Sequence, residues 1–227
     1  MIKKWWLFII CFLMLSLNAN AIELKFNGFI ADEANLLSDQ VEKDLNMTLW
    51  DLQKKSGADI AVVTLPSLNG KTVEEVALDI GRTYKLGAIG KNNGMVFLTS
   101  LAERKMRIEL GLGLEDKISI ATLENIRDND IIPYYKQSNY AVGIARGAYV
   151  LAQIVAQAEG VNNLRVQGNC PPPLSSSGSS SNNEHIPWWA YPFVFLAALF
   201  RGRRGSGSFG GFGGGGGFGG SGCSGSW

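Results

Sequence analysis

The sequence predicts a three-layer α/β/α sandwich over about residues 24–162, with a mixed, mostly parallel sheet of about four strands. Two continuous apolar runs, at 60–63 and 95–98, are typical of strands that are covered on both faces. Segments in which apolar residues recur with helical spacing lie before, between and after these runs. This alternation of strands and helices indicates one sheet with helices on both faces.

The first half of this domain is expected to supply two helices and a central strand. Residues 38–57 keep helical spacing, with a serine suited to cap the first turn and a glycine suited to end the last. Residues 59–65 follow as the central strand. Thr72 and Glu75 form a T-x-x-E capping box, which begins a second helix that ends near Gly87.

The second half is expected to supply a hairpin and two more helices. Residues 94–100 form the second apolar strand, and residues 105–110 alternate strictly between polar and apolar side chains. The short connection between them predicts an antiparallel pair, with the alternating strand half solvated. Helical spacing then covers 119–129 and 139–159.

Gly143 and Gly147 in the last helix have the small-xxx-small spacing of membrane helix pairs. Arg146 lies between them. A charged residue at this position favours close helix packing inside a soluble domain instead.

Residues 1–21 have the pattern of an export signal. Two lysines precede an apolar run from Trp5 to Leu17, and Ala19-Asn20-Ala21 matches the small-x-small pattern of a cleavage site. We expect cleavage before Ile22. The alternative is an uncleaved anchor, but the run is short for the ~20 residues of a spanning helix.

Residues 163–185 are rich in Pro, Ser and Gly and are expected to form a linker. Residues 186–200 (Ile186 to Phe200) follow as a membrane contact, with aromatic residues at one end and the Arg201–Arg204 cluster at the other. Fifteen helical residues reach only about 22 Å, less than the ~30 Å hydrocarbon core. A short transmembrane segment, an interfacial anchor and a docked soluble segment therefore all stay open. Each places the folded domain outside the cytoplasm, at the cytoplasmic membrane.

The Arg cluster and Gly-rich end, residues 201–227, are expected to be a disordered tail, because their composition cannot form a packed core. If residues 186–200 span the membrane, this tail is cytoplasmic. Cys170 and Cys223 would then lie on opposite sides and could not pair.

Composition excludes several function classes. A net charge of +1 over 227 residues gives no bias toward nucleic acid, and we expect no nucleic-acid partner. A single histidine, His185, excludes mechanisms that need two imidazoles. No P-loop, G-x-S-x-G or H-E-x-x-H motif is present, so no catalytic residue is assigned.

Three polar clusters are candidates for a site: Asp32–Glu33, Asn92–Asn93 and Glu109–Asp116. Carboxylate and amide oxygens are ligands of hard cations such as Ca²⁺. We expect the three clusters to converge at one end of the sheet. The alternative is that Asp32 caps a turn, the asparagines form a tight turn and the later acidic residues are solvated.

Four segments of the chain form an ordered set: Phe29–Ser38, Gly57–Thr64, Leu86–Gly94 and Arg107–Glu115. In order and spacing they resemble the TPM-domain family, and the similarity covers about residues 26–158. The export signal, the single C-terminal apolar segment and the Gly-rich end are similar to the exported, membrane-anchored bacterial branch of that family.

The resemblance implies an α/β/α sandwich with a Ca²⁺-type cation site. Asn92 stands where many members have Asp, which removes a charge and is expected to weaken cation binding. A thylakoid-lumen relative is described as an acid phosphatase linked to photosystem II repair, and an animal relative as a receptor auxiliary subunit. The positions that match the family's polar motif are Asp32, Asn92, Asn93, Glu109 and Glu115.

Two functions follow as hypotheses. The first is an exported, membrane-anchored module that binds a divalent cation and acts on an unidentified protein partner or an envelope process. The second is a metal-assisted phosphomonoesterase, in which the cation polarises a phosphoryl oxygen and Lys91 or Arg107 balances charge. The absence of a recognisable nucleophile favours the first.

Overall fold

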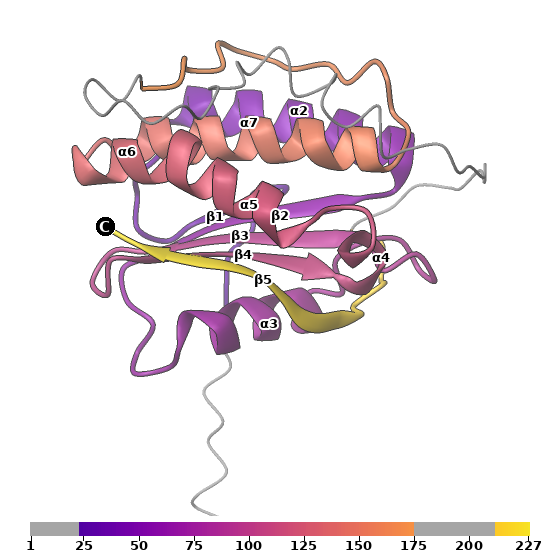
Figure 1. Cartoon of the computed structure of the whole chain (residues 1–227), viewed down its shortest axis with the longest axis horizontal. Coiled ribbons are helices and arrows are strands. Elements are labelled where there is room, and N and C mark those ends of the chain that lie inside the picture. The colour runs from indigo at the N-terminus through magenta and orange to yellow at the C-terminus, as the bar shows by residue number, and fades with distance from the viewer. Residues whose placement is uncertain (1–22, 175–211) are drawn as a thin grey trace, which may run out of the picture.

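The computed structural model describes residues 23–174 and 212–227, and its elements form one five-stranded sheet between two helical layers (Figure 1). Helix α3 (Val73–Thr83) covers one face, and the other face is covered mainly by α2 (Asp39–Ser56) and α7 (Tyr140–Ala158). The predicted α/β fold with helices on both faces is confirmed. The strands are β1 (Ile30–Asp32), β2 (Asp59–Leu65), β3 (Gly94–Ser100), β4 (Lys105–Gly111) and β5 (Phe218–Ser226), and the shorter helices are α4 (Leu112–Glu115), α5 (Ile120–Ile126) and α6 (Ile132–Lys136).

The strands follow one another across the sheet in chain order. Strands β1, β2 and β3 are parallel, whereas β4 is antiparallel to β3 and β5 is antiparallel to β4. The antiparallel pairing of β3 with β4 confirms the predicted hairpin, and β2 lies inside the sheet as expected. Strand β1 has three residues, too few to show a periodicity in the sequence.

Both predicted helix starts are confirmed by their caps. The hydroxyl of Ser38 accepts the N–H of Val41 at the start of α2, and Gly57 ends the helix at φ 77°. At the start of α3, Thr72 Oγ1 accepts the N–H of Glu75 at 3.2 Å, and Glu75 Oε2 accepts the N–H of Thr72 at 2.9 Å. The capping box predicted from T-x-x-E is therefore formed.

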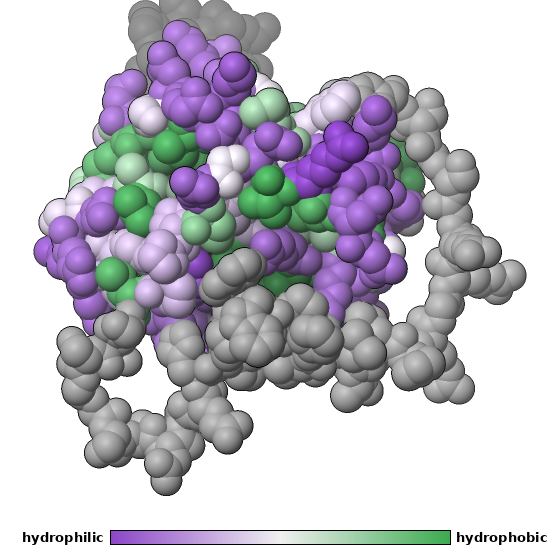
Figure 2. Space-filling model, turned by 90° about the horizontal axis from the view of Figure 1, so that it is seen from above, coloured by the Kyte–Doolittle hydropathy of each residue, from purple (hydrophilic) through white to green (hydrophobic). Residues whose placement is uncertain are grey.

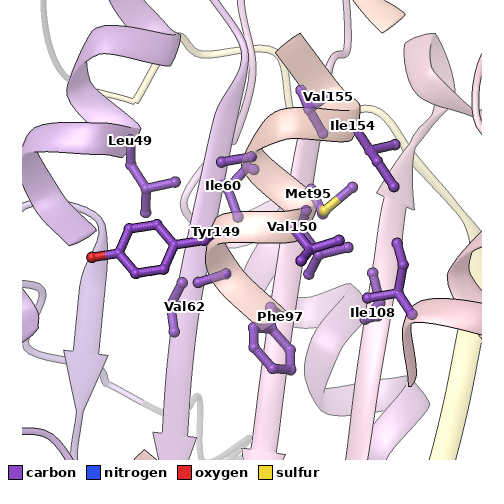
Figure 3. Close-up of a cluster of buried hydrophobic side chains, with 14 of the residues drawn as sticks. Leu49, Ile60, Val62, Met95, Phe97, Ile108, Tyr149, Val150, Ile154 and Val155 are labelled. Atoms are coloured by element: carbon purple, nitrogen blue, oxygen red, sulfur yellow. The ribbon is translucent and has the colours of Figure 1, made fainter. Parts of the chain in front are cut away.

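The larger core lies between the sheet and the layer of α2 and α7 (Figure 3). A Cβ on Gly147 would lie 2.8 Å from Ile131 and 3.0 Å from Phe97, so a glycine here lets α7 approach the sheet closely. This contact is the close packing that the sequence predicted for the glycine spacing around Arg146. The apolar side chains that meet here are Tyr149, Val150, Ile154 and Val155 from α7, and Ile60, Val62, Met95, Phe97 and Ile108 from the sheet.

Within the described part of the chain, α7 is the one helix long and apolar enough to cross a membrane. Its apolar window is 72% buried inside the protein, so packing already accounts for its composition. On the side of the molecule shown in Figure 2, hydrophilic residues surround small groups of hydrophobic ones. The described residues therefore identify α7 as a core helix.

Strand β4 is not half solvated, which corrects the prediction from its alternating sequence. All of its residues except Lys105 are buried, including Arg107 and Glu109. The face that carries these two side chains is covered by α3, and β5 pairs with the edge of β4. An alternating strand is half solvated only when nothing covers its polar face.

Residues 163–174, which the sequence assigns to the linker, run as coil along α2 and α7 (orange in Figure 1). The N–H of Gln167 donates to Thr48 Oγ1 at 2.9 Å, and its carbonyl accepts from the hydroxyl of Tyr149 at 2.6 Å. The folded unit therefore continues past the predicted boundary at residue 162.

The prediction of a disordered C-terminal tail is wrong for residues 212–227. Residues 218–226 form β5, in which Ser226 lies opposite Lys105 and Cys223 lies opposite Ile108. The edge of β4 offers unpaired backbone groups, and a strand with hydrogen-bonding N–H groups satisfies them whatever its apolar content. The predicted signal peptide (1–21), the membrane segment (186–200) and the Arg cluster lie outside the described residues.

Candidate functional site

The predicted cation ligands lie at two opposite ends of the sheet. Asp32 is opposite Thr64, at the end of β2, whereas Gly94, which follows Asn92 and Asn93, is opposite Asp59, at its beginning. From Asp59 to Thr64 a strand spans about 16 Å at about 3.3 Å per residue. The expectation that Asp32 joins the other candidates at one end of the sheet is therefore not met.

Both carboxylate oxygens of Asp32 hold the loop after β1. Oδ1 accepts the N–H of Leu36 at 3.1 Å and the hydroxyl of Thr64, and Oδ2 accepts the N–H of Leu37 at 2.7 Å. These contacts fix the chain between β1 and α2. Asp32 therefore has the turn-capping role that the sequence left as an alternative.

The two asparagines shape the turn before β3. Asn92 adopts φ 49°, a left-handed conformation that asparagine tolerates, and its carbonyl accepts the N–H of Gly113 at 2.9 Å. Asn93 is buried; its Oδ1 accepts the N–H of Ala88 at 2.9 Å, and its Nδ2 donates to Glu159 Oε2 at 3.1 Å. The side chain of Asn93 thus joins this turn to the end of α7.

Glu109 is buried beside Arg107 on the α3 face of β4. Its Oε2 accepts from Arg107 Nε at 2.9 Å and from Nη2 at 2.6 Å. Burial raises the pKa of Glu109, and the negative charge of Glu115 adds to the rise, while Arg107 and the backbone of Gly220 oppose it. Glu109 and Glu115 are therefore near enough to interact electrostatically.

One oxygen of each of these two glutamates has no hydrogen-bond partner. In the described part of the chain, Glu109 Oε1 and Glu115 Oε1 are buried and accept no hydrogen bond. Gly219 of β5 lies against Glu115, since a Cβ there would be 2.9 Å from Glu115 Oε1. A buried acceptor without a donor is costly, and an unplaced ion or water is one explanation.

The remaining oxygen donors limit what this pair could hold. Among residues 23–174 and 212–227, no cluster of three or more His, Cys, Asp or Glu is formed. A soft metal would lack thiolate and imidazole ligands here. Ca²⁺ accepts carboxylates, backbone carbonyls and water together, so two carboxylates under a glycine-rich strand fit a hard cation.

Asp59 is a buried polar residue that sequence reasoning missed. Its Oδ1 accepts from Gln53 Nε2 at 2.6 Å, and its Oδ2 accepts the N–H of Gly87 at 2.8 Å and that of Gly213 at 2.7 Å. The carboxylate thus ties the start of β2 to the loop after α3 and to the C-terminal segment. A charged residue at the head of an otherwise apolar buried strand was the available signal.

Asp59→Asn is expected to change how stability depends on pH. Burial raises the pKa of Asp59 above its ordinary 3.8, although three hydrogen bonds oppose the rise. As pH rises past about 4, Asp59 loses its proton in the unfolded chain before it does so in the folded protein. The wild type therefore loses stability until the pH passes the pKa of Asp59 in the folded protein. In Asp59→Asn, Gln53 can turn its amide and keep its hydrogen bond.

Denaturant unfolding of both proteins between about pH 3 and about pH 7 measures this effect. The free energy of unfolding of the wild type minus that of Asp59→Asn should fall across this range. The other carboxyl groups titrate in both proteins, so their contributions to the free energy of unfolding cancel in this difference. A difference that rises with pH would contradict the role assigned to Asp59.

A surface groove next to α2 is separate from these polar residues, and none of the predicted cation ligands lines it. It lies between residues 27–29 and one side of the helix, and its lining includes Asp39, Glu42, Lys43, Asn46, Met47 and Trp50.

Comparison with known proteins places the fold in a family. The family model for the TPM domain matches residues 30–154, more than half of the chain. The chain belongs to the TPM-domain family. The match covers β1 to most of α7 and therefore includes Glu109 and Glu115, but it ends well before β5.

Three solved structures are similar to parts of this chain. The solution NMR structure of the N-terminal domain of a protein from P. gingivalis is 31% identical, with a TM-score of 0.53, and the match covers 59% of this chain and 85% of that one. The NMR structure of BA42 from Bizionia argentinensis is 21% identical, with a TM-score of 0.47 and coverage of 54% and 83%. The N-terminal domain of cg2496 from Corynebacterium glutamicum is 21% identical, with a TM-score of 0.45 and coverage of 71% and 90%. The search of curated proteins finds no match.

Proposed function

We propose that this TPM domain is a binding module that holds a divalent cation of the calcium type through Glu109 and Glu115. The observation that supports it is the pair of buried, unpaired oxygens, Glu109 Oε1 and Glu115 Oε1. Two carboxylates that lie close together repel each other when both are charged, and a cation between them relieves that repulsion. A cation would relieve this repulsion and supply the missing partners, and it would act as a structural ion that modulates binding to a protein partner.

The proposal uses two of the five predicted ligands. Asp32 caps a loop at the other end of the sheet, and both ends of the Asn93 amide are already hydrogen bonded. The side chain of Asn92 lies against the C-terminal segment: a Cβ on Gly217 would be 2.6 Å from Asn92 Cγ. The remaining ligands would be backbone carbonyls and water, which Ca²⁺ accepts.

The phosphomonoesterase hypothesis loses its proposed residues. Lys91 Nζ donates to the carbonyl of Ser56 at 2.8 Å, and Arg107 is engaged by Glu109. The charge of Arg107 is therefore already balanced by a carboxylate, and Lys91 is held by a backbone carbonyl. The geometry therefore favours the binding module.

Calcium is expected to raise the melting temperature of the wild-type chain and to leave that of Glu115→Gln unchanged. A ligand at about 100 times its Kd adds about 2.7 kcal/mol of stability. Glu115→Gln keeps the size of the side chain but removes one charge, so without calcium it should melt at or above the wild type. Thermal unfolding followed by circular dichroism, with and without calcium, measures both effects.

Asp116→Asn is the matched control, because Asp116 is the exposed neighbour of Glu115. It should keep the full increment with calcium. The proposal fails if millimolar calcium leaves the wild-type melting temperature unchanged, or if Glu115→Gln keeps the increment.

We also propose that the domain is exported and held at the cytoplasmic membrane. Residues 1–21 and 186–200 support this by their composition. A single crossing by residues 186–200 would separate the domain from residues 201–227. Pairing of β5 with β4 needs both on one side of the membrane, which supports an interfacial anchor with the tail on the same side as the domain.

The topology can be tested with cysteines on exposed positions. A membrane-impermeant thiol reagent applied from outside should label Ser226→Cys as readily as Lys136→Cys, a position on the domain; both residues are exposed. The native Cys223 is unsuitable, since it is buried and its pKa is raised to about 11 by that burial. Labelling of Ser226→Cys only after lysis would contradict the proposal.

A further inference from the structure

The edge of β4 and the helices beside it hold the C-terminal strand by its backbone. Three arginines from different elements each donate to a different carbonyl of β5. The contacts are Arg82 Nη2 to Phe218 at 2.9 Å, Arg107 Nη2 to Gly220 at 2.9 Å, and Arg127 Nη1 to Ser224 at 2.8 Å. Charged donors to backbone carbonyls give strong hydrogen bonds that do not depend on the side chains of the bound strand.

Aromatic residues fix the two ends of the strand. Phe218 is buried against α3, where a Cβ on Gly81 would lie 2.8 Å from its ring. Trp227 packs edge-on against Tyr135, with ring centroids 4.5 Å apart, and its centroid is 5.8 Å from that of Tyr140. A strand bound here is therefore fixed in register at both ends.

Glycines between these ends are required by close contacts. A Cβ on Gly222 would lie 2.0 Å from the carbonyl oxygen of Ile108, which is backbone and cannot move aside. A Cβ on Gly225 would lie 2.6 Å from Arg127 Cδ. The β4 edge thus requires glycine at position 222 and leaves little room for a side chain at position 225, and Cys223 between them is buried in the core.

The strand lies outside the matched part of the chain. The TPM match ends at residue 154, and residues 155–217 separate it from β5. An extended peptide that adds a strand to a sheet edge, with pockets for selected side chains, is a known mode of peptide recognition. The β4 edge has both parts of that mode: a backbone ladder and two aromatic contacts.

We propose that the edge of β4 is a peptide-binding site for a glycine-rich C-terminal strand that ends in tryptophan. Its occupant is the chain's own segment, Phe218–Trp227, which is held in cis as a ligand. The site recognises Phe218, Gly222, Gly225 and Trp227 of the strand, while the three arginines bind the carbonyl groups of its backbone. This proposal does not depend on the cation site.

A labelled peptide with the sequence of residues 218–227 tests the site, under reducing conditions and by fluorescence polarisation. The full chain with Phe218→Ala and Trp227→Ala, whose own strand has lost both anchors, should bind the peptide saturably. The wild type should bind it at least about tenfold more weakly, because a tethered strand competes at a high effective concentration. The same peptide with Gly222→Val should bind neither protein.

A second variant guards against loss of folding. The full chain with Gly222→Val keeps both aromatic anchors but cannot seat its own strand, so it should also bind the wild-type peptide. Circular dichroism should show that the α/β fold is retained. Unfolding of both variants would overturn the proposal, because the strand would then be an integral part of the fold.

Three further outcomes would also overturn it. The first is that the folded variants leave the peptide unbound at millimolar concentration, and the second is that they bind the Gly222→Val peptide equally well. A wild-type chain that forms a dimer by exchanging residues 218–227 would contradict occupation in cis, since the strand would then come from a second copy.

Discussion

Arg146→Met is expected to lower the free energy of unfolding by about 3–5 kcal/mol. Arg146 and Asp130 are 1% and 2% exposed, and Arg146 Nε lies 2.7 Å from Asp130 Oδ1. Removing the guanidinium leaves a charged carboxylate in the core, and it also removes the donor to the carbonyl of Pro171. Urea unfolding followed by circular dichroism measures the loss.

Two controls separate this effect from a general loss of charge. Lys71→Met removes an exposed ion pair, in which Lys71 Nζ lies 3.3 Å from Asp79, and should cost less than about 1 kcal/mol. Adding Asp130→Asn to Arg146→Met should recover part of the stability, because the buried charge is then gone. A single variant as stable as the wild type would contradict the role of the pair.

Phe97→Ala is expected to cost about 3–5 kcal/mol through the cavity it leaves. Phe97 is 1% exposed, and it lies in the middle of the core between β3 and α7 (Figure 3). The backbone of α7 at Gly147 already sits against its ring, so nearby atoms cannot collapse far into the space. The midpoint of urea unfolding should fall accordingly.

Met47→Ala serves as the comparison, because Met47 is 39% exposed on α2. It should change the free energy of unfolding by no more than about 0.5 kcal/mol. Equal losses in both variants would mean that Phe97 does not lie in the core described here.

Much of this fold could be predicted because its signals are local. The apolar runs of β2 and β3 follow from burial on both faces, and the capping box at Thr72 and Glu75 follows from hydrogen bonding within one turn. The antiparallel partner of β3 was likewise fixed by a short connection. None of these inferences needed a contact between distant segments.

The errors about the fold concern contacts between segments that are distant in the chain. The alternating sequence of β4 predicts a solvated polar face, but α3 covers that face and β5, more than a hundred residues later, pairs with the edge of the strand. The many glycines of the C-terminus led to a prediction of disorder, although Gly222 is required by its close approach to Ile108. In such a segment the low side-chain content reflects close packing of backbone on backbone.

The candidate site was predicted only in part for a topological reason. Strands β1 and β4 run in opposite directions, so Asp32 and Glu109, each near the end of its strand, lie at opposite ends of the sheet. The antiparallel hairpin was itself predicted, so this separation could have been inferred. The contact that Gly219 of β5 makes with Glu115 could not be inferred from the sequence.

Both proposals require residues 218–226 to lie along β4 in the register that places Ser226 opposite Lys105. Facing residues of antiparallel strands have Cα atoms about 4.5–5.5 Å apart, a distance that a disulfide can bridge. Lys105 and Ser226 are both exposed. In a Cys170→Ser background, Lys105→Cys with Ser226→Cys should therefore form this disulfide within a monomer, as peptide mapping by mass spectrometry would detect.

Lys105→Cys with Ser221→Cys is the control, because position 221 lies about 16 Å further along the strand. It should form no such bond. A 105–226 disulfide formed in high yield, without a 105–221 disulfide, is the predicted result; no 105–226 disulfide, or equal yields of both, would contradict the docked strand.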